Sequence, residues 1–162
     1  MNEMIPDKHG GSLAGRMDVR LWLRLLSCST VIEKRLRRRF ADQFDTTLPR
    51  FDVLAALDRY RDGMTMGELS RALLVSNGNV TALVRHLEAQ GLVLIESAPT
   101  DRRSQVVSLT SLGISHFKDL AAAHHQWIGE MLAGVAADQQ EELLRLLGSV
   151  KASISRDDRE AE

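Results

Sequence analysis

Apolar positions along most of the chain recur every three or four residues, which is the spacing of one face of an α-helix. This spacing predicts a long helix over 17–44 and further helices within 46–63, 64–75, 76–91, 111–135 and 138–154. Between 92 and 110 the pattern changes to apolar, β-branched runs over 92–97 and 104–110, separated by a turn over 98–103. We therefore predict a mainly α fold with one small β-hairpin.

The order of these elements is informative about the central part of the chain. Two short helices joined by a tight turn and followed directly by a hairpin form a winged helix-turn-helix, which we place over residues 49–110. In such a lobe the second helix enters the major groove of DNA with its N-terminus first. Double-stranded DNA is therefore the expected partner of this lobe.

The helix expected over 76–91 begins with a turn that buries nothing, although ordinary helix formers would stabilise it more. A helix end that approaches bases and phosphates needs small residues, side-chain amides and exposed backbone N–H groups. The alternative is that the serine and the asparagines of this turn only cap the helix. The predicted DNA contacts on this helix are Ser76, Asn77, Gly78, Asn79, Thr81 and Arg85.

Two adjacent arginines, Arg102 and Arg103, lie at the predicted tip of the hairpin. Such a tip suits the minor groove, whose negative potential attracts a guanidinium group. Asp101 cannot favour DNA by its charge, so we expect it to orient one of the arginines through a bidentate hydrogen bond. The alternative is a solvated turn with a surface ion pair worth less than about 1 kcal/mol.

Charge is distributed unevenly along the 162 residues, although the formal net charge is only −1. Residues 1–103 carry 16 Lys and Arg against 13 Asp and Glu, a balance of +3, whereas residues 104–162 carry 5 against 9, a balance of −4. The basic segment contains most of the predicted DNA-binding lobe, from residue 49 to residue 103. This asymmetry agrees with a nucleic-acid partner but does not identify one by itself.

Other kinds of chemistry find little support in the sequence. The three histidines at 116, 124 and 125 do not have the spacing of a zinc site, and we expect them to face solvent. We find no phosphate-binding loop, nucleophile elbow or pair of catalytic carboxylates, and we expect neither an enzyme nor a cofactor. The sequence has no apolar run of membrane-spanning length and no secretory signal pattern, so we expect a cytoplasmic protein with no membrane partner.

The segment MTMGELSRALLVSNGNVTALVRHLEAQGLV, followed by DRRSQVVSLTSLG, resembles the MarR family of dimeric winged-helix regulators. The resemblance extends over roughly residues 20–155. It implies that Asp101 and Arg103 occupy the two wing positions, with Arg103 in the minor groove. Ala82 departs from family members that have an arginine there, which argues against a strong guanine contact at this point. The resemblance assigns base contacts to Asn77, Asn79, Thr81 and Ala82.

This resemblance also implies a homodimer on a palindromic operator, intertwined through the first helix and the last two helices. The dimerisation region would be 17–48 together with 111–156, flanked by disordered segments at 1–16 and 157–162. Such a dimer explains why the helix over 19–36 is apolar on more than one face. It also explains the leucine stripe between 143 and 154, which a monomer would not need.

Shorter stretches, including VRLWLRLLSCSTVIEKRLRRRF, TTLPRFDVLAALDR and VSNGNVTALV, are similar to family members that control aromatic-acid catabolism. Those members respond to aromatic acyl-CoA thioesters such as p-coumaroyl-CoA. The similarity implies a repressor whose effector lies between the dimerisation helices and the DNA-binding lobe. Trp22 would then form an aromatic wall, while Arg24, Arg38 and Arg50 would face the CoA phosphates. The alternative places Trp22 in the core and the basic residues on a solvated face.

Two further functions remain open as alternatives. The winged helix could bind another protein in place of DNA, although a protein interface favours aromatic or aliphatic anchors over the polar turn at 76–79. A redox-sensing repressor could act through Cys28, the only cysteine of the chain. We expect Cys28 to be an inert core residue, because it lies among apolar residues and burial raises the pKa of a thiol.

Overall fold

The computed structural model describes residues 16–97 and 105–160, with side chains described as far as 155. The described residues form two compact units that divide after His125. The first unit contains α1 (Met17–Phe44), α2 (Leu48–Arg59), β1 (Met64–Thr65), α3 (Met66–Leu73), α4 (Asn77–Ala89), β2 (Val93–Ser97), β3 (Gln105–Leu109) and most of α5 (Ser111–Leu132). The second unit contains the end of α5 and α6 (Ala137–Glu160).

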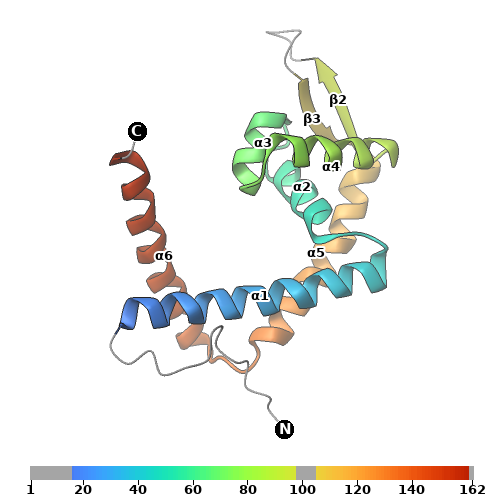
Figure 1. Ribbon diagram of the computed structural model, residues 1–162. Helices are drawn as coiled ribbons and strands as arrows, with labels where there is room; N and C mark the ends of the chain where they lie inside the picture. Colours follow the sequence, from blue (N-terminus) through green and yellow to red (C-terminus); the bar gives the residue numbers. More distant parts are fainter. Residues whose placement is uncertain (1–15, 98–104, 161–162) are drawn as a thin grey trace. The chain divides into compact units, whose positions relative to one another are not determined.

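The mainly helical fold with a small antiparallel wing is confirmed, and Figure 1 shows β2 and β3 side by side next to α4. The sheet has three strands in the order β1-β3-β2, whereas we predicted only the two strands of the hairpin. The third strand, β1, pairs Met64 with Val107 and Thr65 with Val106. A strand of two residues is too short to produce a recognisable alternation of apolar and polar positions.

Helices α2, α3 and α4 pack around a common apolar core in the first unit. Leu69 of α3 is fully buried in this core. One turn further along α3, Ala72 is exposed and Leu73 is only half-buried. The fully buried side chains of this core are Phe40, Val53, Leu54, Leu57, Leu69, Val80, Val84, Leu87, Val107 and Leu120.

An aromatic cluster joins α1, α2 and α5 within the first unit. The ring centroid of Phe51 lies 4.9 Å from that of Phe40 and 5.7 Å from that of Phe117. His124 stacks on Phe51 at 4.7 Å, so the prediction that this histidine faces solvent is wrong. Partial burial, with a smaller contribution from neighbouring His125, lowers the pKa of His124. The apolar surroundings therefore favour its neutral form, which serves as a flat packing surface.

Two residues of α1 are more exposed than their apolar neighbours suggested. Cys28 is exposed, which overturns the expectation that it is a core residue. Trp22 has 58% of its surface exposed, so it does not lie in the core of this chain. Both positions lie on a helix that is apolar on more than one side, and burial of one side leaves the other at the surface.

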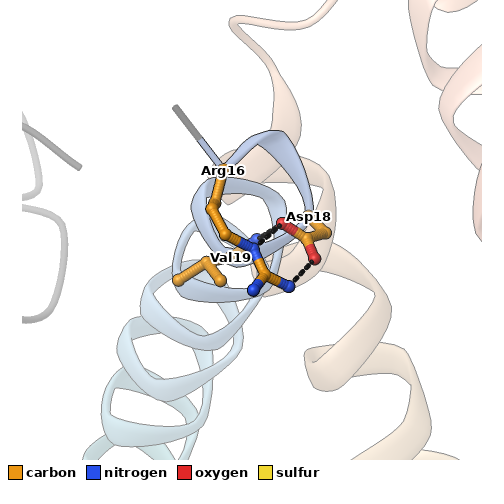
Figure 2. A network of polar contacts seen from close by, with 3 residues as sticks. All are labelled: Arg16, Asp18 and Val19. Carbon is orange, nitrogen blue, oxygen red and sulfur yellow. Dashed lines mark hydrogen bonds and ion pairs between the residues drawn. The ribbon is translucent and has the colours of Figure 1, made fainter. Parts of the chain in front are cut away.

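A local polar network joins the residue before α1 to the first turn of this helix (Figure 2). The Arg16 guanidinium lies 2.6 Å from Oδ2 of Asp18, and the Val19 backbone N–H donates to Oδ1 of the same carboxylate at 2.9 Å. These contacts lower the pKa of Asp18, with the arginine making the larger contribution. A carboxylate in the first turn also interacts favourably with the positive end of the helix dipole.

The junction between the wing and α5 depends on one threonine and one glycine. The Thr110 hydroxyl donates to the Gly91 carbonyl at 2.7 Å and accepts from the Gly113 backbone N–H at 3.0 Å. A Cβ atom at Gly113 would lie only 1.9 Å from the carbonyl oxygen of Leu92. The Leu-Thr-Ser-Leu-Gly sequence therefore lets the first turn of α5 lie directly against the start of β2.

We expect Gly113→Ala to destabilise the fold strongly, because the new methyl group would overlap backbone atoms that cannot move independently. Overpacking of this kind costs about 1–3 kcal/mol. Chemical denaturation of the variant and the parent would measure the loss. Equal stability would show that α5 and β2 approach each other less closely than this geometry requires.

No helix among the described residues is both long and apolar enough to cross a membrane. Helix α6 continues to Glu160, whereas the sequence predicted a disordered tail from 157. Helical propensity explains the difference, because the charged residues of this segment include good helix formers and no proline or glycine. The N-terminal residues predicted as disordered lie outside the described residues, except for Arg16.

Candidate nucleic-acid interface

Helices α3 and α4 form the helix-turn-helix, and each end of this unit has an identifiable cause. A capping box begins α3, in which the Glu68 backbone N–H donates to the Thr65 hydroxyl and the Thr65 backbone N–H donates to the Glu68 carboxylate. The turn passes through Leu74, which has a left-handed backbone with φ of 55°. Gly91, with φ of 70°, follows the last turn of α4 at the predicted stop.

The N-terminus of α4 is open. Ser76 occupies the N-cap position, yet its side chain makes no capping hydrogen bond. The Val80 backbone N–H donates to the Ser76 carbonyl at 3.2 Å, and the backbone N–H groups that precede it have no acceptor one turn back along the helix. This finding argues against capping as the reason for a serine at this position. The helix end therefore presents N–H groups and a partial positive charge to whatever approaches it.

All the predicted contact residues of α4 are exposed, whereas Val80, Val84 and Leu87 are buried on its other side. At about 100° per residue, Thr81, Arg85, Ala82 and Asn79 span about 160° of the helix surface, and Asn79 lies only about 60° from Ala82. These residues therefore share the face of α4 that is turned away from its buried side. One ligand can contact them together along this exposed face and at the N-terminal end of the helix.

Two of these side chains already have partners within α4. The Thr81 hydroxyl donates to the Asn77 carbonyl at 2.9 Å. Arg85 forms an ion pair with Glu88, with 2.9 Å between the guanidinium nitrogen and the carboxylate oxygen. The sequence analysis did not predict this pair. An exposed ion pair contributes less than about 1 kcal/mol, so a phosphate can replace Glu88 as the partner of Arg85 at little cost.

Strands β2 and β3 run antiparallel up to the base of the wing, where Ser97 lies opposite Gln105. The segment between these two residues contains Asp101, Arg102 and Arg103. These three residues lie outside the described residues, so their predicted roles stay predictions.

The predicted effector residues do not form one small pocket. Trp22, Arg24 and Arg38 all belong to α1, and the rise of about 1.5 Å per residue separates positions 22 and 38 by about 24 Å along the helix. Arg50 lies in the first turn of α2 and is half-buried. A single compact aromatic acid cannot contact both ends of this set.

Asp52 of α2 borders two cavities and was not among the site residues predicted from the sequence. It is half-buried, and burial raises the pKa of its carboxyl group to about 6. A single acidic residue between buried Phe51 and Val53 marks this position in the sequence, but nothing in the sequence indicates the cavities beside it. Within the described part of the chain, no cluster of three or more His, Cys, Asp or Glu residues is arranged to hold a metal ion.

Comparison with known proteins identifies relatives along most of the chain. A model of the MarR family matches residues 44–104. The transcriptional activatory protein BadR of Rhodopseudomonas palustris is 31% identical over 140 residues, which cover 85% of this chain and 79% of that protein.

Solved structures give the same result for the fold. A MarR family transcriptional regulator from Silicibacter pomeroyi is 34% identical, with a TM-score of 0.72, over 84% of this chain and 94% of that one. A MarR family regulator from Streptomyces coelicolor, solved in complex with DNA, has a TM-score of 0.76 over 90% and 92% of the two chains. Its identity is 20%, so this second likeness is one of fold alone.

Proposed function

Because this chain belongs to the MarR family of DNA-binding transcriptional regulators, we propose that it binds a palindromic operator as a homodimer and is released by a small-molecule effector. The observation that carries the DNA-binding role is the open N-terminus of α4, with its uncapped Ser76 and exposed amides. The helix tip enters the major groove, where Asn77 and Asn79 contact base edges. The wing arginines contact the minor groove.

Gly78 lies at the centre of this tip, and its lack of a side chain supports close contact with DNA. A Cβ atom at Gly78 would meet nothing within 4 Å, so packing inside the chain does not require a glycine there. A glycine weakens a helix by up to about 1 kcal/mol relative to alanine. Close approach to bases or phosphates is the reason we propose for its presence.

We expect Gly78→Ala to stabilise the fold by up to about 1 kcal/mol and to weaken operator binding by at least about 1 kcal/mol. Thermal unfolding and fluorescence anisotropy with labelled duplex DNA would measure the two opposite effects. Gly148→Ala is the matched control, because a Cβ there also meets open space and the position faces away from Val150 on α6. Equal DNA affinity of the Gly78 variant and the parent would contradict close approach at the tip.

The proposed homodimer is supported by apolar side chains that remain exposed in each unit of the single chain. In the first unit, α1 exposes 49% of Leu21 and 58% of Trp22. In the second unit, α6 exposes between 36% and 74% of each of the leucines at 143, 144, 146 and 147, and 60% of Ile154. Helices with such surfaces are stable in water when a partner chain covers them.

For the effector, we propose an aromatic acid or its CoA thioester, on the basis of the sequence stretches that are similar to regulators of aromatic-acid catabolism. The exposed arginines at 24 and 38 supply positive charge for the phosphates of a CoA group. We propose that the protein is a repressor, although the name of the Rhodopseudomonas palustris relative describes an activator. The effector binds more tightly to the dimer conformation in which the two α4 helices are not spaced to enter successive major grooves. It therefore shifts the population away from the conformation that binds DNA.

Titration of p-coumaroyl-CoA, benzoyl-CoA, p-coumarate and free CoA against the operator complex tests the proposed effector class. We expect at least one thioester to release DNA while the free acid and free CoA do not, because the acyl and phosphate groups must bind together. A 100-fold loss of DNA affinity requires about 2.7 kcal/mol of coupling, and DNA must weaken thioester binding by the same factor. Release by the free acid alone would contradict the thioester proposal.

A further inference from the structure

Two neighbouring cavities open beside α2 in the first unit, and they share Asp52 and Leu73 as lining residues. The smaller has a volume of about 240 Å³ and lies among α1, α2, the turn after α3, and α4. The larger has a volume of about 480 Å³ and extends along α2 and the end of α3. The larger volume lies within the usual range of small-molecule sites, and the smaller lies just below it.

The polar group at the junction of these cavities is the Asp52 carboxylate. Among the described residues it has neither a hydrogen bond nor an ion pair. Burial raises its pKa to about 6, nearby Arg37 opposes this shift, and Glu33 adds to it. Arg37 is itself paired with Glu33 at 3.3 Å. The carboxylate is thus ionised at neutral pH without a cation of its own.

The wall of the smaller cavity beside this carboxylate is largely apolar, whereas the larger cavity is more polar. Leu48, Pro49, Val75 and Leu83 line the smaller cavity together with Leu73. In the larger cavity Arg59 lies two helical turns from Asp52, and its exposed side chain is screened by solvent. A ligand that fits both features carries one positive charge on an apolar body.

We infer that the cavities beside Asp52 bind an organic ammonium compound, with its protonated amine against the Asp52 carboxylate and its apolar body against Leu73 and Leu83. The inference goes beyond the proposed function, because this site is distinct from the effector residues proposed above. Trp22, Arg24, Arg38 and Arg50 do not line either cavity.

Occupation of this site would affect the DNA-binding elements directly. Val75 belongs to the turn of the helix-turn-helix and Leu83 belongs to α4, while Glu33 and Arg37 belong to α1. A bound molecule therefore contacts α1 and the DNA-binding helix at the same time. Any change in operator affinity that it causes must be matched by an equal change in its own affinity when DNA is bound.

Calorimetric titration of the full chain with 2-phenylethylamine, and with 3-phenylpropionate as a body of similar shape and opposite charge, tests the inference. We expect the amine to bind and the carboxylate to bind at least tenfold more weakly. Asp52→Asn should weaken amine binding at least tenfold. Asp58→Asn is the control and should have no effect, because Asp58 lies on the same helix, pairs with Arg61 at 2.6 Å and does not line the cavities.

The pH dependence of amine affinity distinguishes binding through the Asp52 carboxylate from apolar packing in the cavity. With a pKa of about 6, amine affinity should fall about tenfold between pH 7 and pH 5 as Asp52 is protonated, and it should be constant in the Asn variant. Leu83→Phe, which fills the smaller cavity but keeps the carboxylate, should also weaken the amine. Circular dichroism would establish that each variant is folded.

Three results would overturn the inference: no binding of the amine to the parent at millimolar concentration, equal amine affinity of the parent and the Asn variant, or preference for the carboxylate. None of these measurements involves DNA or an acyl-CoA compound. Failure of the ammonium site is therefore distinguishable from failure of the proposed repressor function.

Discussion

A variant in which Leu146 and Val150 are both replaced by glutamate is expected to lose the dimer, much of its stability and operator binding together. Leu146 is 46% exposed in the single chain, and Val150 lies on the same stripe of α6. Burial of a leucine or valine side chain stabilises by about 1.5–3 kcal/mol, and two-fold symmetry repeats each loss in the partner. Four buried carboxylates would add the cost of unpaired charge.

Sedimentation at micromolar concentration would measure this effect directly. The parent should have a mass of about 36 kDa, twice the 18.1 kDa of one chain, while the double variant should be monomeric or unfolded. Ala152→Glu is the control, because Ala152 is exposed and lies about 200° around α6 from Val150. A folded monomeric parent would contradict the proposed dimer.

The second prediction with a large expected effect distinguishes the contribution of the wing to DNA binding from that of the α4 tip. Arg103→Ala should weaken binding to every DNA sequence and reduce the salt dependence by about one unit per wing, hence about two per dimer, because a phosphate-neutralising charge is lost. Asn79→Ala should instead cost about 1–3 kcal/mol on the preferred operator and less on random duplex DNA. Fluorescence anisotropy over a range of salt concentrations would measure both.

Gln90→Ala provides the matched amide control for Asn79. Gln90 is also exposed but lies at the opposite end of α4, so its loss should change neither kind of binding. Equal losses of specific and non-specific binding in the Arg103 and Asn79 variants would show that the wing and the tip do not have separate roles.

Most of the helical architecture was predictable because the apolar spacing and the stop residues act locally. The sequence placed α1 at 17–44, as the structure does, and it placed the stop of α4 at Gly91, two residues beyond the last helical residue, Ala89. Strand β1 was missed because two residues show no periodicity. His124 was misplaced because adjacency to His125 does not show which of two neighbouring histidines faces the aromatic cluster.

The exposed first turn of α4 was predictable because its glycine and two asparagines neither favour a helix nor contribute to an apolar core. The exposure of Cys28 and Trp22 was not, since an apolar helical stripe looks alike whether the same chain or a partner chain covers it. The cavities beside Asp52 arise where α1, α2, α3 and α4 meet. No local pattern encodes such a space.

Selection of bound duplexes from a random DNA pool tests whether this chain recognises DNA as a symmetric dimer through the tips of its α4 helices. We expect enrichment of an inverted repeat whose half-sites are centred about 10–10.5 base pairs apart, because two recognition helices must enter successive major grooves. The Asn79→Ala variant should select a more relaxed version of the same repeat. Failure to enrich any sequence, or enrichment of a single asymmetric site, would contradict this account.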